Sequence, residues 1–296
     1  MTDAFSTYHP MVNFLYFTLV LLFSMFFMHP VCLGISLLSA FSYNVYIKGK
    51  KAVSFSFKYM LPLLIATALI NPAFNHEGGT ILTYLRDGNP LTLESITYGI
   101  AAATMFITVI FWFSCYNTVM TSDKFVYLFG RIIPALSLVL SMALRFVPRF
   151  RAQLKVVSNA QKCVGRDVSN GSLLQRAKHG IKILSIMVTW ALENAIETAD
   201  SMRSRGYGLP GRTAFSIYRF DSRDKKAMAF LIFCGGYILI GSMFGGLYYR
   251  YFPTMKGVKL QAYPISLFLC YMTLCISPLA INLREDRKWK ALQSEI

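Results

Sequence analysis

Long apolar segments alternate with short polar connections over most of this 296-residue chain. A helix that crosses the hydrocarbon core of a membrane needs about 17–25 predominantly apolar residues. Segments of this kind are Met11–Met28, Val31–Ile47, Phe57–Phe74, Ile96–Cys115, Ala227–Tyr249 and Tyr263–Ile281. Only His29-Pro30 separates the first two, which predicts a helical hairpin, whereas Pro62 and Asn71-Pro72 interrupt the third. The pattern predicts an all-α polytopic membrane protein with about six transmembrane helices.

The pattern changes between the fourth and fifth apolar segments. About 110 residues, 117–226, carry shorter or one-sided apolar runs, and a connection of that length requires structure of its own. In Ile132–Val147 the apolar side chains recur at i, i+3, i+4 and i+7, while Ser141 and Arg145 belong to a separate polar strip. We interpret this segment as an amphipathic helix at the membrane surface or beneath the membrane helices, with a spanning helix as the alternative.

Two further helices are predicted after this segment. The first is Pro148–Val164, and the glycine-bearing stretch "GRDVSNG" (165–171) follows it. Ser172 and Gln175 form the capping box of the second helix, which is predicted to reach Arg205. Gly206 is then its left-handed cap.

Apolar residues repeat along this last helix at spacings of three and four that alternate over nearly the whole run, which predicts a seam that packs on another helix. The seam consists of Leu174, Ala177, Ile181, Leu184, Val188, Ala191, Ala195, Ala199 and Met202. Charged residues elsewhere on the helix exclude it as a membrane span.

The distribution of charge predicts how the chain is oriented. Of the 30 Lys and Arg residues, eighteen lie between Lys124 and Lys226, whereas the 75–95 loop holds only Arg86. The positive-inside rule therefore places both termini and the long insert in the cytoplasm of a multi-pass protein of the cell membrane, without a cleavable signal peptide. The predicted division is 1–119 for N-terminal membrane helices, 120–225 for a cytoplasmic helical module, and 226–296 for a C-terminal membrane hairpin with a basic tail.

Composition narrows the classes of function. The chain is 55% hydrophobic and 15% charged, its mean hydropathy is +0.46 and its formal net charge is +16. Lipid headgroups and a cytoplasmic partner account for that charge, so no nucleic acid is expected as a partner. Six cysteines without a C-x-x-C pair and four scattered histidines do not indicate a metal site. No P-loop motif or catalytic set is recognisable, so neither a bound cofactor nor a catalytic residue is expected.

Arg203 and Arg205 stand immediately before several glycines at the end of the last predicted helix. In one interpretation they are a stop signal, because cations near a helix C-terminus interact favourably with its dipole. In the other, a guanidinium that projects past the glycine cap docks on another protein and pairs with a carboxylate or with carbonyl groups. The residues alone leave both interpretations open.

Five motifs stand in order along the chain. They are "NPAFNHEGGTIL" (71–82), "GNPLTLESITYG" (88–99), "SMALRFVPRF" (141–150), "NAQKCVGRD" (159–167) and "ALENAIETADSMRSRGYG" (191–208). Together they make nearly the whole chain resemble the transmembrane T component of energy-coupling-factor transporters, the ABC-type importers of vitamins and transition-metal ions.

The resemblance implies a scaffold and not an enzyme. In that family the T component holds a substrate-binding S component in the membrane, and its cytoplasmic coupling helices press on two ABC ATPase subunits. The ATPases use the ATP, and the S component selects the vitamin or metal ion. Each of two coupling helices ends in a short motif centred on Arg, typically Ala-Arg-Gly, which inserts into a groove on one ATPase.

One of these motifs is matched here and the other is altered. Ser204-Arg205-Gly206 matches the second, with Ser in place of Ala. At the first, Cys163-Val164-Gly165 has Val164 where the family has arginine, and Arg166 follows two residues later. Either the motif has shifted to Gly165-Arg166-Asp167, or the first site docks without an arginine.

Two other classes of function are weighed against the scaffold. A membrane-embedded enzyme, such as a lipid-modifying transferase, would use the polar residues of the outer loop, which are His76, Glu77, Asp87 and Glu94. Their spacing follows no ligand pattern. A secondary transporter would show an internal repeat and charges at the membrane midplane, and the sequence shows neither.

Overall fold

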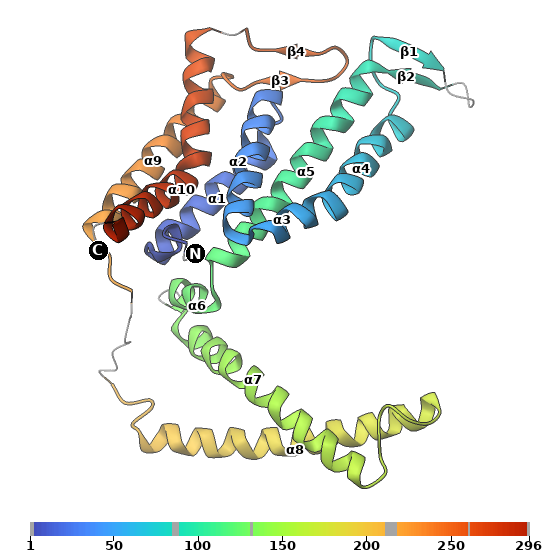
Figure 1. Ribbon diagram of the computed structural model, residues 1–296, viewed down its shortest axis with the longest axis vertical. Helices are drawn as coiled ribbons and strands as arrows, with labels where there is room; N and C mark the ends of the chain where they lie inside the picture. The colour runs from blue at the N-terminus through green and yellow to red at the C-terminus, as the bar shows by residue number, and fades with distance from the viewer. Residues whose placement is uncertain (1–2, 85–88, 131–132, 211–217, 260, 295–296) are drawn as a thin grey trace. The chain divides into compact units, whose positions relative to one another are not determined.

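The computed structural model describes residues 3–84, 89–130, 133–210, 218–259 and 261–294 (Figure 1). The chain divides into two compact units. Residues 1–124 and 218–296, here called the membrane unit, contain the apolar helices. Residues 125–217, here called the insert unit, contain two long amphipathic helices.

The helices of the membrane unit coincide with the six apolar segments of the sequence. Single helices are α1 (Pro10–Phe26), α2 (Pro30–Lys48), α5 (Leu93–Val119), α9 (Ser222–Met243) and α10 (Ala262–Ser294). The third segment runs from α3 (Lys50–Phe55) through a π-helical turn (Ser56–Met60) into α4 (Leu61–Phe74). Five of the six are long and apolar enough to cross a membrane, and α1, with 17 residues, is shorter. The prediction of a nearly all-α polytopic membrane protein is confirmed.

Two of the connections contain small hairpins that the sequence did not predict. Strand β1 (Ile81–Tyr84) pairs antiparallel with β2 (Pro90–Thr92), and β3 (Tyr249–Arg250) pairs with β4 (Lys256–Gly257). The connections are joined by the backbone N–H of Gly79, which donates to the carbonyl of Pro253 over 2.9 Å. They therefore form a common cap over one end of the helices of the membrane unit (Figure 1).

Histidine and proline begin α1 and α2 in the same way. His9 and His29 are the N-cap residues, and the Nδ1 atom of each accepts a 3.2 Å hydrogen bond from the backbone N–H two residues later. A proline follows at the first helical position, where its missing N–H costs nothing. These histidines thus have a structural role at the starts of the two helices.

A buried polar chain crosses the core of the membrane unit. The indole N–H of Trp112 donates to the hydroxyl of Ser36 over 2.9 Å, and Ser36 lies 2.7 Å from the hydroxyl of Ser24. All three residues are buried. Because hydrocarbon supplies no hydrogen-bond partners, such groups must satisfy one another inside the protein. The chain links α5, α2 and α1.

Helices α4 and α5 approach each other closely at Gly99. A Cβ atom at this position would lie 2.6 Å from the carbonyl oxygen of Ala68 and 3.2 Å from the side chains of Asn71 and Pro72. Only glycine permits that separation, since real Cβ atoms do not approach a backbone oxygen so closely. Small residues at helix interfaces allow the same close packing in membrane proteins generally.

Lys124 lies at the point where the chain leaves the membrane unit. Its side chain is 6% exposed, and its ammonium donates to the carbonyls of Ser6 (2.5 Å) and Val119 (2.9 Å). Burial lowers the pKa of this ammonium, and the carboxylate of Asp3 partly offsets the shift. Lys124 thereby ties the end of α5 to the N-terminal 3₁₀ turn (Phe5–Thr7).

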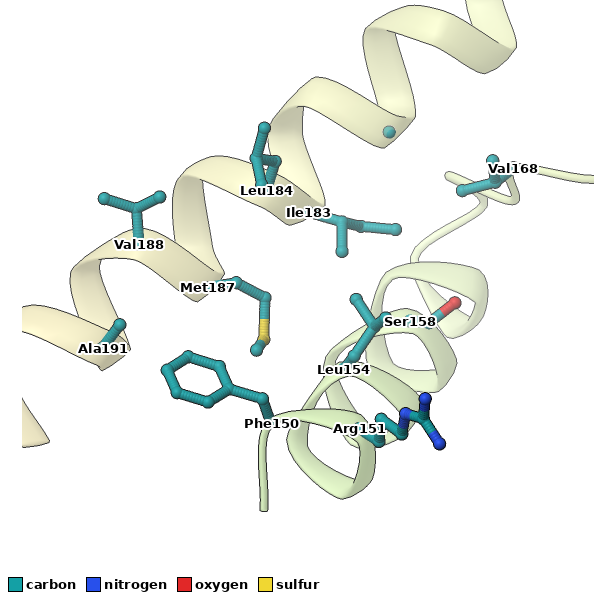
Figure 2. A pocket seen from close by; sticks show the side chains of 11 residues that line it. Phe150, Arg151, Leu154, Ser158, Val168, Ile183, Leu184, Met187, Val188 and Ala191 are labelled. Carbon is teal, nitrogen blue, oxygen red and sulfur yellow. The ribbon is translucent and has the colours of Figure 1, made fainter. Parts of the chain in front are cut away.

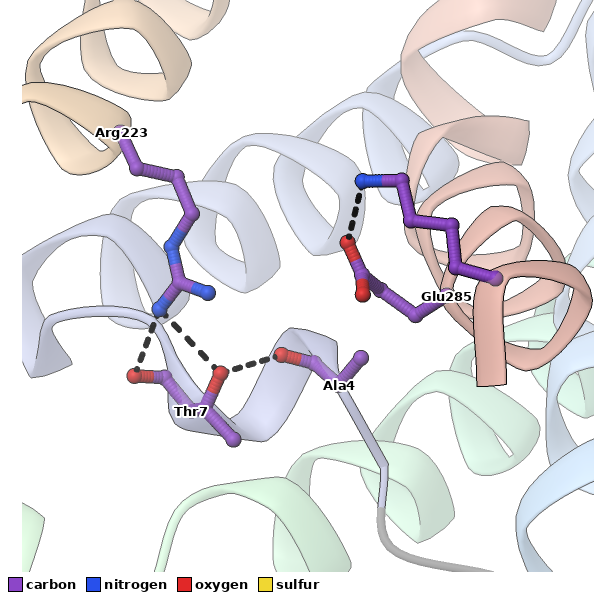
Figure 3. A network of polar contacts seen from close by, with 5 residues as sticks. Ala4, Thr7, Arg223 and Glu285 are labelled. Atoms are coloured by element: carbon purple, nitrogen blue, oxygen red, sulfur yellow. Dashed lines mark hydrogen bonds and ion pairs between the residues drawn. The ribbon is translucent and has the colours of Figure 1, made fainter. Parts of the chain in front are cut away.

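The same turn holds the start of α9, where the chain re-enters the membrane unit. The guanidinium of Arg223 donates to the carbonyl (3.4 Å) and hydroxyl (3.3 Å) of Thr7 (Figure 3). It also lies over the ring of Tyr8. The carboxylate of Asp224 accepts a 3.0 Å hydrogen bond from the backbone N–H of His9. The two segments of the membrane unit that flank the insert, at Lys124 and Arg223, are therefore both bound to one N-terminal turn.

The long insert folds into α6 (Ser122–Gly130), α7 (Pro134–Cys163) and α8 (Leu173–Ser204). The short helix α6 was not predicted. The prediction of separate helices at Ile132–Val147 and Pro148–Val164 is wrong, because α7 continues through Pro148. Proline removes one backbone hydrogen bond, but the apolar stripe keeps its helical period on both sides of it. Helix α7 is not among the candidate membrane spans of the described residues.

Helices α7 and α8 pack through one small apolar cluster. Val157 of α7 is buried against Ile183 and Met187 of α8, and the ring of Phe150 meets Trp190 edge-on with 5.2 Å between centroids. The predicted seam of α8 lies beside this contact and is largely exposed. Its large residues Leu174, Ile181, Leu184 and Val188 are 86%, 68%, 62% and 50% exposed.

Helix α7 is therefore not the partner of the seam. It packs on the neighbouring face of α8, which presents Ile183, Met187 and Trp190. An open groove of about 620 Å³ remains between the two helices, and Leu184, Val188 and Ala191 of the seam line one side of it (Figure 2).

Candidate functional site

The C-terminal end of α8 is closed by its own backbone. Arg205 is the C-cap residue, and Gly206 follows with a φ of 80°, a left-handed conformation that favours glycine. The N–H of Gly206 donates to the carbonyl of Arg203, and the N–H of Tyr207 to that of Met202, both over 3.0 Å. This pair of bonds is a Schellman motif. The prediction of Gly206 as a left-handed cap is confirmed, and the helix itself ends one residue earlier than predicted, at Ser204.

Because the backbone satisfies its own carbonyls, the Arg205 side chain is not needed to cap the helix. It is exposed, and its guanidinium has no hydrogen bond or ion pair to the part of the chain that the structure describes. The Ser204 hydroxyl, by contrast, donates back to the carbonyl of Ser201 over 2.9 Å. The tip of α8 thus presents an exposed cation, Arg205, that has no partner among the described residues.

The C-terminal end of α7 has the same construction. Val164 is the C-cap residue, and Gly165 follows with a φ of 75°. The N–H of Gly165 donates to the carbonyl of Lys162 over 3.0 Å, and the N–H of Arg166 to that of Gln161 over 2.9 Å. The side chain of Val164 is 67% exposed, and Cys163 beside it is also exposed.

The hydrogen bonds of the two caps show which residue of one predicted motif corresponds to which residue of the other. Cys163-Val164-Gly165 corresponds to Ser204-Arg205-Gly206, because in each motif the left-handed glycine and the residue after it donate to the carbonyls three and five residues earlier. Val164 is the backbone counterpart of Arg205, and Arg166 is the counterpart of Tyr207, beyond the left-handed glycine. The sequence left open whether the first motif has shifted to Arg166 or docks without an arginine. This correspondence favours the second alternative, in which the C-terminal end of α7, here called the first tip, has no arginine.

The loop between α7 and α8 is held by side-chain contacts to the ends of both helices. The carboxylate of Asp167 accepts a 3.0 Å hydrogen bond from the backbone N–H of Ser169 and lies 3.5 Å from the ammonium of Lys162. The Ser169 bond, aided by Lys162, holds the pKa of the Asp167 carboxyl below its usual value. The guanidinium of Arg176 donates to the carbonyl of Val168 over 2.7 Å. The loop is therefore cross-linked to both helices that it connects.

The two tips lie apart. Helices α7 and α8 cross, and their C-terminal ends lie on opposite sides of the crossing (Figure 1). The structure brings the predicted residues of each motif together but does not bring the two motifs to one site. Two separate partner surfaces fit this arrangement.

The polar residues that were considered for a membrane-embedded enzyme lie in the connection between α4 and α5 and at the start of α5. Glu94 is buried and accepts hydrogen bonds from the backbone N–H (3.2 Å) and hydroxyl (2.9 Å) of Thr80, so it holds the loop before α5. Asp87 lies outside the described residues. No group of three or more potential metal ligands occurs within the residues that the structure describes.

Comparison with known proteins covers most of the chain, up to residue 215 in the family match. Residues 5–215 match the family model CbiQ, described as cobalt transport protein. A relative from Streptococcus equi, named energy-coupling factor transporter transmembrane protein EcfT, is 30% identical over 60% of this chain and 70% of its own length. A protein of the same name from Listeria innocua is 30% identical over 62% of this chain and 75% of its own length.

Shorter matches reach higher identity. A relative of the same name from Lactobacillus helveticus is 37% identical over 109 residues. That alignment spans 36% of this chain and only 39% of the relative.

Proposed function

Because the chain belongs to the CbiQ cobalt transport family, we propose that it is the coupling subunit of an energy-coupling factor importer. In this proposal the tips of α7 and α8 dock on two cytoplasmic ATPase subunits. The insert unit transmits their ATP-driven movement to a substrate-binding S component in the membrane. The observation that carries the proposal is the pair of helix ends that share one backbone geometry, are exposed and point to separate places.

The proposal assigns a division of labour among the subunits. The S component selects the substrate, a vitamin or a transition-metal ion, and the ATPases bind ATP. This chain itself binds neither and carries no catalytic residue. The exposed apolar seam and groove of α8 supply the surface on which a membrane partner rests, since exposed apolar patches of this extent mark interaction sites.

Reconstitution tests this function. Proteoliposomes that contain the chain, its S component and the ATPase pair should accumulate substrate only with Mg-ATP, and omission of this chain should abolish uptake. The purified chain alone should show no turnover of lipid substrates. Turnover by the isolated chain would favour the membrane-embedded enzyme instead.

The proposed orientation places both termini and the insert unit in the cytoplasm of a cell-membrane protein. Cysteine labelling at Asn89 and Ser169 tests it. The labelling starts from a Cys163→Ser background, because Cys163 is exposed while Cys270 is half-buried and the other cysteines are buried. An impermeant maleimide should label Asn89→Cys in intact cells and Ser169→Cys only after permeabilisation. Labelling of Ser169→Cys from outside would contradict the orientation.

A further inference from the structure

The third apolar segment of the membrane unit begins with a stretch of unbalanced positive charge. Residues 48–60, here called the basic segment, contain four lysines, whereas residues 4–76 contain no Asp or Glu at all. The lysines are Lys48, Lys50, Lys51 and Lys58. The basic segment lies at the end of the membrane unit opposite the hairpin cap (Figure 1). In the proposed orientation this end faces the cytoplasm.

Three of the four ammonium groups are available to an anion. Lys48 donates to the hydroxyl of Ser114 over 2.5 Å. Lys50, Lys51 and Lys58 are exposed, and they form no hydrogen bond or ion pair with the residues that the structure describes. Both ion pairs found in that part of the chain involve other cations. The charge of the basic segment is therefore not neutralised by the protein.

Exposed aromatic rings stand between these lysines. Phe55, Phe57 and Tyr59 are exposed, Phe57 to 67%. The ring centroids of Phe55 and Tyr59 lie 5.3 Å apart, and the ammonium of Lys58 lies 5.3 Å from the centroid of the Tyr59 ring. Aromatic side chains, together with lysines that extend past apolar surface, are typical of the headgroup level of a membrane. The basic segment thus combines the side chains that occupy a membrane interface.

The basic segment continues directly into an exposed apolar helix. Residues Lys50–Phe74 form one candidate membrane span, and only 6% of its apolar window is buried in the protein, compared with 39% for α2 and for α5. Leu61, Ile65 and Leu69 recur every four residues of α4 and are all exposed. This spacing places them on one face of the helix, as an apolar stripe that starts where the basic segment ends.

We propose that the basic segment binds the phosphate of an anionic phospholipid whose acyl chains lie along the exposed stripe of α4. Lys50, Lys51 and Lys58 supply the charge, and the exposed rings pack beside the glycerol region of the lipid. A zwitterionic lipid binds more weakly, because it adds an ammonium group where the cations are already unbalanced. The inference does not depend on the proposed docking of the insert unit.

The continuity of the two surfaces favours a lipid over a soluble anion or an acidic soluble protein. A free phosphate would contact the lysines but would leave the stripe of α4 in contact with other apolar material. An acidic soluble protein could not follow the helix into the hydrocarbon region, where unpaired polar groups are costly. A phospholipid has its phosphate and its hydrocarbon in the order in which the helix presents lysines and apolar side chains.

Native mass spectrometry of the full chain measures this binding. Phosphatidylglycerol should bind about tenfold or more tightly than phosphatidylcholine with the same acyl chains. The triple variant Lys50→Gln, Lys51→Gln, Lys58→Gln should abolish that preference, because each lysine near an anionic membrane surface contributes about fivefold in affinity. Replacement of the same three lysines by arginine keeps the charge and should keep the preference.

Three cations in the last part of α10 provide the matched control. The triple variant Arg287→Gln, Lys288→Gln, Lys290→Gln removes the same charge from exposed positions, but one of these cations already has a partner. The ammonium of Lys288 lies 3.3 Å from the carboxylate of Glu285. The control should keep its preference for phosphatidylglycerol. Equal losses from the two triple variants, or equal binding of the two lipids by the wild type, would overturn the proposal.

Photo-cross-linking in reconstituted bilayers locates the lipid. A phosphatidylglycerol analogue with a photoreactive acyl chain should label residues 48–74, and unlabelled phosphatidylglycerol should compete, whereas glycerol 3-phosphate should not. Equal competition by glycerol 3-phosphate would show a site for soluble phosphate. Labelling that disappears when the chain is assembled with its membrane partner would show that a protein covers this face. Either result, or labelling confined to other helices, would overturn the proposal.

Discussion

Replacement of Arg205 by alanine is expected to weaken association of the chain with the proposed ATPase partner by about 10–100-fold. The guanidinium has no partner in the described part of the chain and stands at the outermost position of α8, so its loss removes contacts made only in the complex. Charge-assisted hydrogen bonds contribute on the order of 1.5–3 kcal/mol, and each 1.4 kcal/mol is about a factor of ten in affinity. The measurement is co-purification of the ATPase pair together with substrate-stimulated ATP hydrolysis.

Arg203→Ala provides the matched control for this substitution. It removes the same charge from the same turn of α8, and only the backbone carbonyl of Arg203 takes part in the cap. A cation near a helix C-terminus is worth a few tenths of a kcal/mol, so this variant should assemble nearly as well as the wild type. Equal losses from both variants would indicate a general electrostatic attraction. Full assembly and coupling by Arg205→Ala would show that the arginine is only a stop signal.

Replacement of Gly99 by alanine is expected to destabilise the membrane unit. The added Cβ would lie 2.6 Å from the carbonyl oxygen of Ala68, a backbone atom that cannot turn away, so α4 and α5 must separate. Overpacking of this kind costs about 1–3 kcal/mol. The thermal unfolding midpoint of the purified protein in detergent should fall accordingly.

Gly236→Ala controls for the change in helix propensity. Gly236 lies inside α9, and a Cβ atom there would meet nothing within 4 Å, so alanine adds the same propensity without a clash. Its unfolding midpoint should equal or exceed that of the wild type. Equal midpoints for Gly99→Ala and Gly236→Ala would mean that α4 and α5 do not depend on this close approach.

Several features of the protein follow from short stretches of sequence. Each apolar segment became a helix where it was predicted, because hydrocarbon requires every backbone group in a span to be satisfied within it. The capping box of α8 is present, with Gln175 and Ser172 each bonded to the backbone of the other. Gly206 adopts its left-handed conformation because glycine alone does so without strain. These outcomes depend on neighbours along the chain.

Local rules were misleading where a longer pattern outweighed them. Pro148 predicted the start of a helix, but α7 continues through it because the apolar stripe on either side belongs to one helix. Helix α6 has nine residues, too few to show a helical period in the sequence. His9 and His29 acquire their capping role through Nδ1, which the spacing of the histidines does not reveal.

The sequence by itself thus determined the class of the protein, its apolar helices, helix α8 of the insert and the glycine cap at the end of α8. Only the tertiary structure decided which face of α8 meets α7, because two apolar faces lie side by side on that helix and the choice depends on what α7 presents to them. It also decided that Val164, and not Arg166, is the counterpart of Arg205. That register is set by which N–H closes each helix end on which carbonyl, and the sequence letters permitted either arrangement.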